Sequence, residues 1–209
     1  MTSKKLTQAQ LKKQLESYSP KDLIAEISEL YRRFPDVKNY YQLKFSPQSE
    51  SEIVNGYKAK IKKEFFPTRG FGRARLSIAK KPISEYKKVC FTPASLVDLM
   101  IYYVEQGVRF TIEYGDINEA FYISMESMFD QALKIIQEND LHDIFFSRCC
   151  MIVNNTRGIG WGFHDGLHTI FAETYNRPKS QKLGCPSHFV SKPSHFRNFN
   201  YINAAPMLV

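Results

Sequence analysis

Residues 67–75 read PTRGFGRAR and hold the densest group of side chains suited to binding an anion. Two glycines allow a tight turn just before a helix, and such a turn can present backbone N–H groups and guanidinium groups to one phosphate. Phe71, between the glycines, is an aromatic ring that can stack on a nucleic-acid base. This segment therefore predicts contact with phosphate or nucleic acid through Arg69, Arg73 and Arg75.

Lysines on both sides extend the same basic segment. Residues 58–88 contain eleven Lys or Arg, against only Glu64 and Glu85. A segment with this charge favours a polyanionic partner. The predicted contact residues for nucleic acid or another polyanion are Lys62, Lys63, Arg69, Phe71, Arg73, Arg75, Lys80 and Lys81.

The rest of the chain contains acidic residues that can pair with the basic segment in place of an external polyanion. Residues 1–91 carry 20 Lys or Arg and 9 Asp or Glu, whereas residues 92–175 carry 4 and 12. The acidic half can fold back and neutralise the basic half, with Phe71 filling the core. The competing hypothesis is thus a protein-interaction adaptor that docks to an acidic protein surface or to itself. Arginines that face solvent favour binding of nucleic acid or another polyanion. Arginines paired with Asp98, Glu105, Glu119 or Glu126 favour the adaptor.

His164 and His168 have the i, i+4 spacing of two metal ligands on one helix. A metal site needs further ligands, and Glu173 is expected to face away from the pair. We expect structural or surface histidines and no cofactor, and a metal-dependent enzyme using this pair is the third hypothesis.

The preceding turn, residues 157–162 (RGIGWG), lacks the Lys-Ser/Thr of a P-loop, and is expected to let Trp161 pack. No catalytic residue is predicted, since no nucleophile lies beside an identifiable base.

Helical periodicity from residue 7 to 175 supplies the elements that must position these residues. Thr7 and Ser19 are expected helix caps, and Pro82 should kink or divide a helix over about 73–88. Residues 108–114 have an extended pattern, and Asp116 with Glu119 resembles a capping box for the helix that follows. The predicted fold class is all-α, either a compact multi-helix bundle or stacked antiparallel helix pairs.

The chain divides by composition into two parts. Residues 1–175 are predicted to form one all-α domain with a basic half (1–91) and an acidic half (92–175). Residues 176–209 contain four prolines and no acid, which predicts a non-helical basic tail with Pro, Ser and His. No apolar run reaches the ~18 to 20 residues of a membrane span, so we expect a cytoplasmic protein without membrane contact. The oligomeric state does not follow from the sequence.

Three motifs together resemble a known family. They are residues 63–72 (KEFFPTRGFG), 121–129 (FYISMESMF) and 158–165 (GIGWGFHD). Over about residues 5–175 the chain is similar to a family of bacterial helical proteins known only as a domain of unknown function. The resemblance implies an all-helical fold, and it implies no activity or catalytic residues.

Overall fold

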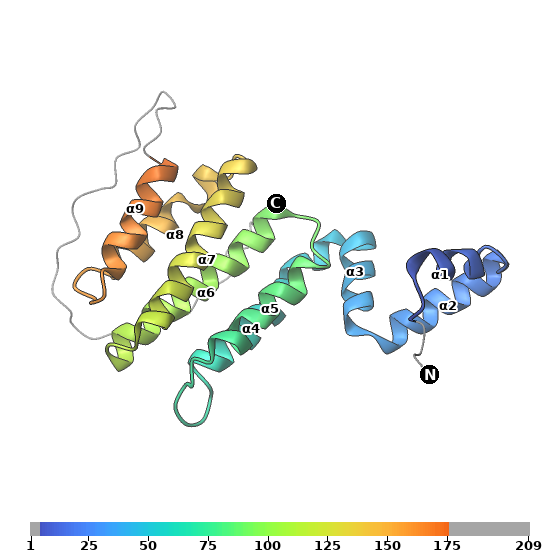
Figure 1. Ribbon diagram of the computed structural model, residues 1–209, viewed down its shortest axis with the longest axis horizontal. Coiled ribbons are helices and arrows are strands. Elements are labelled where there is room, and N and C mark those ends of the chain that lie inside the picture. The colour runs from blue at the N-terminus through green and yellow to red at the C-terminus, as the bar shows by residue number, and fades with distance from the viewer. Residues whose placement is uncertain (1–4, 176–209) are drawn as a thin grey trace, which may run out of the picture. The chain divides into compact units, whose positions relative to one another are not determined.

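The computed structural model describes residues 5–175, and the tail predicted for 176–209 lies outside them. Over the described residues the fold is all-α, as predicted (Figure 1). Nine α-helices and one 3-10 turn follow each other along this part of the chain. They are α1 (Gln8–Leu15), α2 (Pro20–Arg33), α3 (Pro35–Phe45), η1 (Pro47–Ser49), α4 (Glu50–Phe65), α5 (Leu76–Lys87), α6 (Pro93–Tyr114), α7 (Glu119–Glu138), α8 (His142–Asn155) and α9 (Phe163–Tyr175).

From α4 onward the helices form antiparallel pairs that pack on one another. Glu64 at the end of α4 contacts Arg75 just before α5, so these two helices form a hairpin. Gly107 of α6 lies against Met125 of α7, and Val153 of α8 contacts His164 of α9. Helix α6 is central, since it packs against α4, α5, α7 and α8. Antiparallel neighbours of this kind belong to both predicted architectures, the compact bundle and the stacked pairs.

The core follows these pairs and is rich in aromatic rings. Phe65, Tyr103, Phe121 and Phe129 are almost completely buried. Phe65 packs edge-on against Tyr103, with ring centroids 5.7 Å apart. Burying each such ring removes about 150–250 Å² from water, which makes aromatic packing a main stabilising contribution here.

Two helix caps are as predicted, and one is not. The side chain of Thr7 accepts a hydrogen bond from the backbone of Gln10, and Ser19 caps α2 in the same manner. The capping box predicted for Asp116 and Glu119 is wrong, because Asn118 caps α7 and accepts from the backbone N–H of Phe121 at 2.9 Å. Asp116 lies outside the helix and makes tertiary hydrogen bonds.

The extended segment predicted at 108–114 is also wrong, since α6 continues as a helix to Tyr114. Val108, Phe110 and Thr111 are all buried there, because α6 packs against several helices. A helix buried on more than one side loses the polar face that identifies helical periodicity.

Pro82 does not divide the fifth helix. Helix α5 is continuous from Leu76 to Lys87 and begins three residues later than predicted. Pro82 is buried, as are Ala79, Ile83 and Tyr86 of the same helix. Tertiary packing with α4 and α6 therefore outweighs the local cost of an interior proline.

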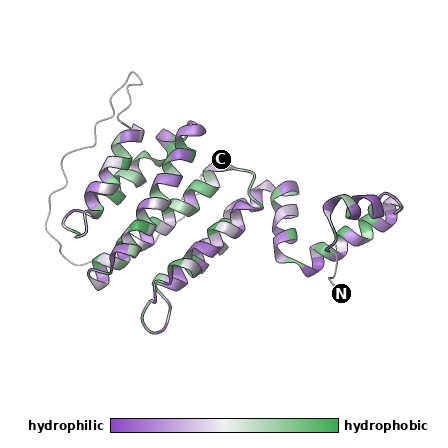
Figure 2. Ribbon diagram, viewed as in Figure 1, coloured by the Kyte–Doolittle hydropathy of each residue, from purple (hydrophilic) through white to green (hydrophobic). Residues whose placement is uncertain are grey.

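Helix α2 differs from the helices of the core. It is strongly amphipathic, with hydrophobic and hydrophilic residues alternating along the ribbon in Figure 2, and it has no buried residue. Ile24 and Ile27 on its apolar side are 66% and 42% exposed. Within residues 5–175, none of the helices is long and apolar enough to cross a membrane.

Candidate nucleic-acid interface

Residues 66–75, which we call the arginine loop, connect α4 to α5 and fold back onto the end of α4 (Figure 1). The backbone N–H groups of Arg73 and Ala74 both donate to the carbonyl oxygen of Glu64, at 3.1 and 3.2 Å. Gly70 has φ +76°, a conformation that favours glycine. Gly72 passes so close to α4 that a Cβ there would lie 1.7 Å from the carbonyl oxygen of Phe65. The two glycines thus have separate roles, one in the turn and one in the close approach.

The side chain of Glu64 closes the base of the arginine loop. Its carboxylate accepts from the backbone N–H of Arg75 at 3.0 Å and from Nε of the same residue at 2.7 Å. A third bond runs from Nη2 of Arg75 to Oε2 at 3.0 Å. The hydrogen bond from the Arg75 side chain holds the pKa of Glu64 below its usual value, although burial opposes the shift. Glu64 is therefore charged at neutral pH and anchors the loop.

Arg75 is consequently a positioning residue. Nε and Nη2 of its guanidinium group both donate to Glu64, so its positive charge is paired within the protein. The partner is an acid of the basic segment, and not one of the acids of residues 92–175 that the sequence suggested. The sequence did not reveal this role of Glu64, because its single negative charge reduces the large positive charge of residues 58–88 only slightly.

Phe71 lies at the tip of the arginine loop and is 84% exposed. Its ring touches the protein edge-on at Tyr114, with centroids 6.4 Å apart. Tyr114 in turn packs on Phe110, at 4.7 Å, and Phe110 is buried. The alternative in which Phe71 fills the core is wrong. The ring rests against Tyr114 and is otherwise largely exposed to solvent.

Four of the predicted basic residues surround this ring or lie at the same end of the α4–α5 hairpin. Arg69 and Arg73 flank Phe71 in the loop, and Lys62 and Lys63 lie in the last turn of α4. All four are exposed and have no ion-pair partner among residues 5–175.

Lys80 and Lys81 lie more than one turn into α5, farther from the loop tip. Lys81 is exposed and approaches Glu85 at 3.9 Å, whereas Lys80 is half-buried. The structure therefore concentrates unpaired positive charge nearer the loop tip, while these two lysines extend it along α5.

One further cation, Arg109 of α6, joins the base of the loop and was not predicted. Its guanidinium carbon lies 4.3 Å from the ring centre of Phe66, the first residue of the loop. The side chain is 58% exposed, and its ion pair with Glu113 is long, at 3.7 Å. Arg109 belongs to the acidic half of the sequence, so only the packing of α6 beside α4 could identify it.

The acidic half neutralises only a limited part of the basic segment. Asp98 binds Lys58 at 2.7 Å, at the end of the segment opposite to the loop. Asp98 and Glu105 also bind Arg148 of their own half, the latter at 2.7 and 2.9 Å. These acids are occupied within the core pairs, and the arginine loop keeps its net charge.

Within the part of the chain that the structure describes, His164 and His168 are not brought together with further metal ligands. Nδ1 of His164 lies 3.1 Å from both the Thr156 hydroxyl and the Val153 carbonyl oxygen, which fixes the ring against α8. Among residues 5–175, no group of three or more His, Cys, Asp or Glu side chains is placed to hold a metal ion. The geometry gives His164 a structural role.

The turn before α9 forms a different contact from the one expected. Trp161 is 60% exposed, and its indole Nε1 donates to Asp116 at 2.7 Å. Asp116 also accepts from the hydroxyl of Tyr122 on α7. The turn thus links α9 to the start of α7 through hydrogen bonds, and Trp161 does not fill the core.

Comparison with known proteins identifies a family and no activity. Residues 6–175 match a family of unknown function (DUF6155), which covers every described helix. No curated protein and no solved structure matches the chain. The arginine loop, the middle of α7 and the turn before α9 all lie in the matched region, and the chain belongs to this family of unknown function, DUF6155.

Proposed function

We propose that this protein binds nucleic acid, mainly through the phosphate backbone, at the arginine loop. The observation that carries the proposal is the placement of Phe71, which is 84% exposed between two exposed arginines that form no ion pair with the described residues. A large apolar ring held in water is unfavourable by about 1.5–3 kcal/mol relative to burial, so a binding role explains its position. The ring suits a base, and the flanking guanidinium groups suit the phosphates on either side.

The geometry favours single-stranded over double-stranded nucleic acid. Phe71 lies at a loop tip, where it can stack only on a base that is not already stacked in a duplex. Arg69, Arg73, Lys62 and Lys63 provide about four phosphate contacts, and such contacts do not distinguish base sequence. Binding is expected to be tolerant of sequence and sensitive to salt.

The test is fluorescence anisotropy with a labelled single-stranded oligonucleotide and its duplex at low salt. Phe71→Ala should weaken single-strand binding by about 1–3 kcal/mol, the range for loss of one stacked base, and should change duplex binding little. Phe45→Ala is the matched control, because Phe45 is also strongly exposed (72%) and lies on α3, outside the arginine loop.

Each result separates the proposal from its alternatives. Equal loss of single-strand and duplex binding in Phe71→Ala would contradict base stacking. Binding of heparin or polyphosphate with an affinity that matches the oligonucleotide, unaffected by Phe71→Ala, would support a general polyanion site. Failure to bind any of these ligands at low salt would leave the adaptor hypothesis, with an acidic protein surface as the partner.

A further inference from the structure

We propose that α2 mediates self-association by packing antiparallel against α2 of a second copy of this chain. The apolar side of α2 is formed by Leu23, Ile24, Ile27, Leu30 and Tyr31, and Phe34 follows directly as the residue that ends the helix. Together they cover an arc of about 120° on the helix. Five of the six are at least 36% exposed, although α2 also packs with α3. Contiguous apolar patches of this kind are uncommon on monomers and usually mark an interface.

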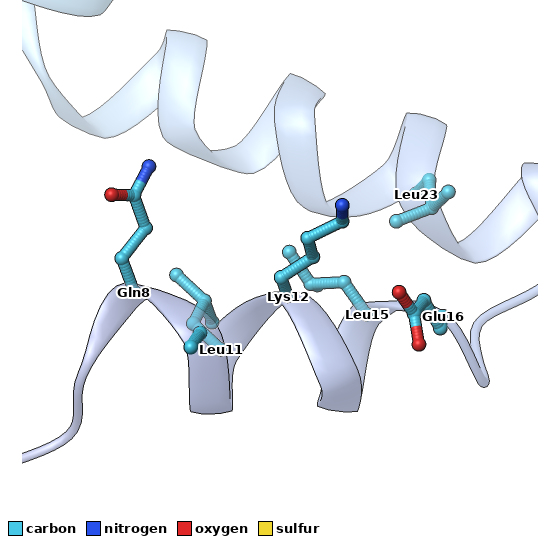
Figure 3. A pocket seen from close by; sticks show the side chains of 7 residues that line it. Gln8, Leu11, Lys12, Leu15, Glu16 and Leu23 are labelled. Atoms are coloured by element: carbon cyan, nitrogen blue, oxygen red, sulfur yellow. The ribbon is translucent and has the colours of Figure 1, made fainter.

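The spacing of these residues suits a helix as the partner. Leu23, Ile27, Leu30 and Phe34 recur at intervals of four, three and four residues, the pattern of a helix–helix seam. Helix α1 covers this side only in part. A cleft of about 680 Å³ lies between the two helices, and Figure 3 shows Leu11 of α1 and Leu23 of α2 lining it. The surface next to the seam is thus also apolar.

The charges beside the seam indicate which helix fits. Asp22 and Glu26 lie along one border of the apolar arc in the first half of α2, and Arg33 lies along the same border in the last turn. Two antiparallel copies related by a two-fold axis bring this border of one copy against the same border of the other. Arg33 of each copy then faces Glu26 of the other, at two symmetric positions.

Existing ion pairs leave these charges available. Glu26 has no ion-pair partner among the described residues. The ion pair of Arg33 with Glu29 is long, at 3.8 Å, and its guanidinium carbon lies 6.0 Å from the ring centre of Phe34. Glu29 is held by Arg32 through bonds of 3.0 and 2.7 Å, which neutralises Arg32 on the opposite border. A parallel arrangement would place the basic last turns of the two α2 helices at the same end, where they repel each other. The charge pattern therefore favours the antiparallel arrangement.

The test is sedimentation equilibrium of the full chain, without nucleic acid, over a range of micromolar concentrations. The wild type should form a dimer. Glu26→Arg and Arg33→Glu should each weaken dimerisation about tenfold, because an attraction becomes a repulsion at two symmetric contacts. The double variant Glu26→Arg/Arg33→Glu should restore the wild-type constant to within about twofold. Glu138→Arg is the control, since Glu138 is exposed at the end of α7.

A second variant tests the apolar contact itself. Ile27→Asp should give a monomer while circular dichroism and the thermal transition stay close to wild type, since α2 has no buried residue. A wild type that is monomeric at every concentration would overturn the proposal. So would a dimer in which the double charge variant is no stronger than the single variants. Neither result depends on nucleic-acid binding, so the two proposals fail separately.

Discussion

At the scale of single residues, the arginine loop depends on one glycine that cannot be replaced. Gly72→Ala places a methyl group on the backbone of Phe65, and a backbone atom cannot move aside as a flexible side chain can. We expect a loss of about 1–3 kcal/mol in the free energy of unfolding and weaker oligonucleotide binding. Urea denaturation and anisotropy measure the two effects.

Gly56 provides the matched control for this substitution. It lies inside α4, with no atom within 4 Å of the position of an added Cβ. Gly56→Ala should therefore stabilise the protein by up to about 1 kcal/mol through helix propensity. A Gly72→Ala protein as stable and as active in binding as Gly56→Ala would contradict the close approach described for the loop.

Glu64 makes the stability of the same loop depend on pH. Its pKa is lowered in the folded state, so its contribution is complete above the ordinary glutamate pKa of about 4.3 and is lost as the pH falls through the lower folded value. Glu64→Gln should cost about 1 kcal/mol or less at pH 7, because Arg75 is half exposed. Denaturant midpoints measured from pH 7 to pH 2 should converge for the two proteins. A constant difference over that range would show that the charge of Glu64 does not stabilise the fold.

At the scale of the helices, the contact between α6 and α7 depends on the absence of a side chain. A Cβ on Gly107 would lie 2.2 Å from the sulfur of Met125, which is buried. Gly107→Ala should cost about 1–3 kcal/mol by overpacking. When Met125 is already replaced by Ala, Gly107→Ala should cost less, because the smaller side chain leaves room for the added methyl group. Thermal unfolding of the wild type, the two single variants and the double variant measures this coupling. Strictly additive effects would be inconsistent with direct contact.

The helices also show what the sequence can and cannot predict. The cap predicted at Ser19 is present at the start of α2, because capping depends on neighbouring residues alone. Residues 108–114 were interpreted wrongly, and Pro82 does not divide its helix, because both lie where tertiary packing surrounds the helix. Asp116 was assigned to a helix cap, since its bond to Trp161 joins residues 45 positions apart and leaves no local signal.

The candidate site was predictable to a similar extent. Composition identified the arginine loop and its exposed cations, Arg69 and Arg73. The sequence did not reveal that Arg75 is bound by Glu64, or that Arg109 approaches from α6. Both facts depend on how the ends of α4 and α6 pack, and not on spacing along the chain.

At the scale of the whole molecule, the described fold ends with a packed aromatic residue. The ring of Tyr175 lies 4.7 Å from that of Phe171 and 5.3 Å from that of Phe146. A chain ending at residue 176 should therefore unfold cooperatively, with a Tm within a few degrees of the full chain. A chain ending at residue 162 lacks Phe163 and Leu167, which are fully buried, and should lose the cooperative transition. Differential scanning calorimetry makes the comparison, and loss of cooperativity in the longer fragment would refute this boundary.

Charge across the whole molecule leads to the central claim. The acidic half binds Lys58 and its own Arg148, and leaves the arginine loop positive. Binding at this loop should therefore release counterions from nucleic acid in proportion to the phosphates that it contacts. The adaptor hypothesis predicts no such release.

The most direct measurement is the salt dependence of single-strand binding by the wild type and by Arg69→Ala/Arg73→Ala, with Lys134→Ala/Arg157→Ala as a control for loss of two cations elsewhere. With about four phosphate contacts, the logarithm of the wild-type binding constant should fall with the logarithm of salt concentration at a slope of about −3. The loop variant should flatten this slope by about 1.4, at ~0.7 per contact, and the control should not change it. Equal slopes for the wild type and the loop variant, or binding independent of salt, would contradict the assignment of the arginine loop as the nucleic-acid interface.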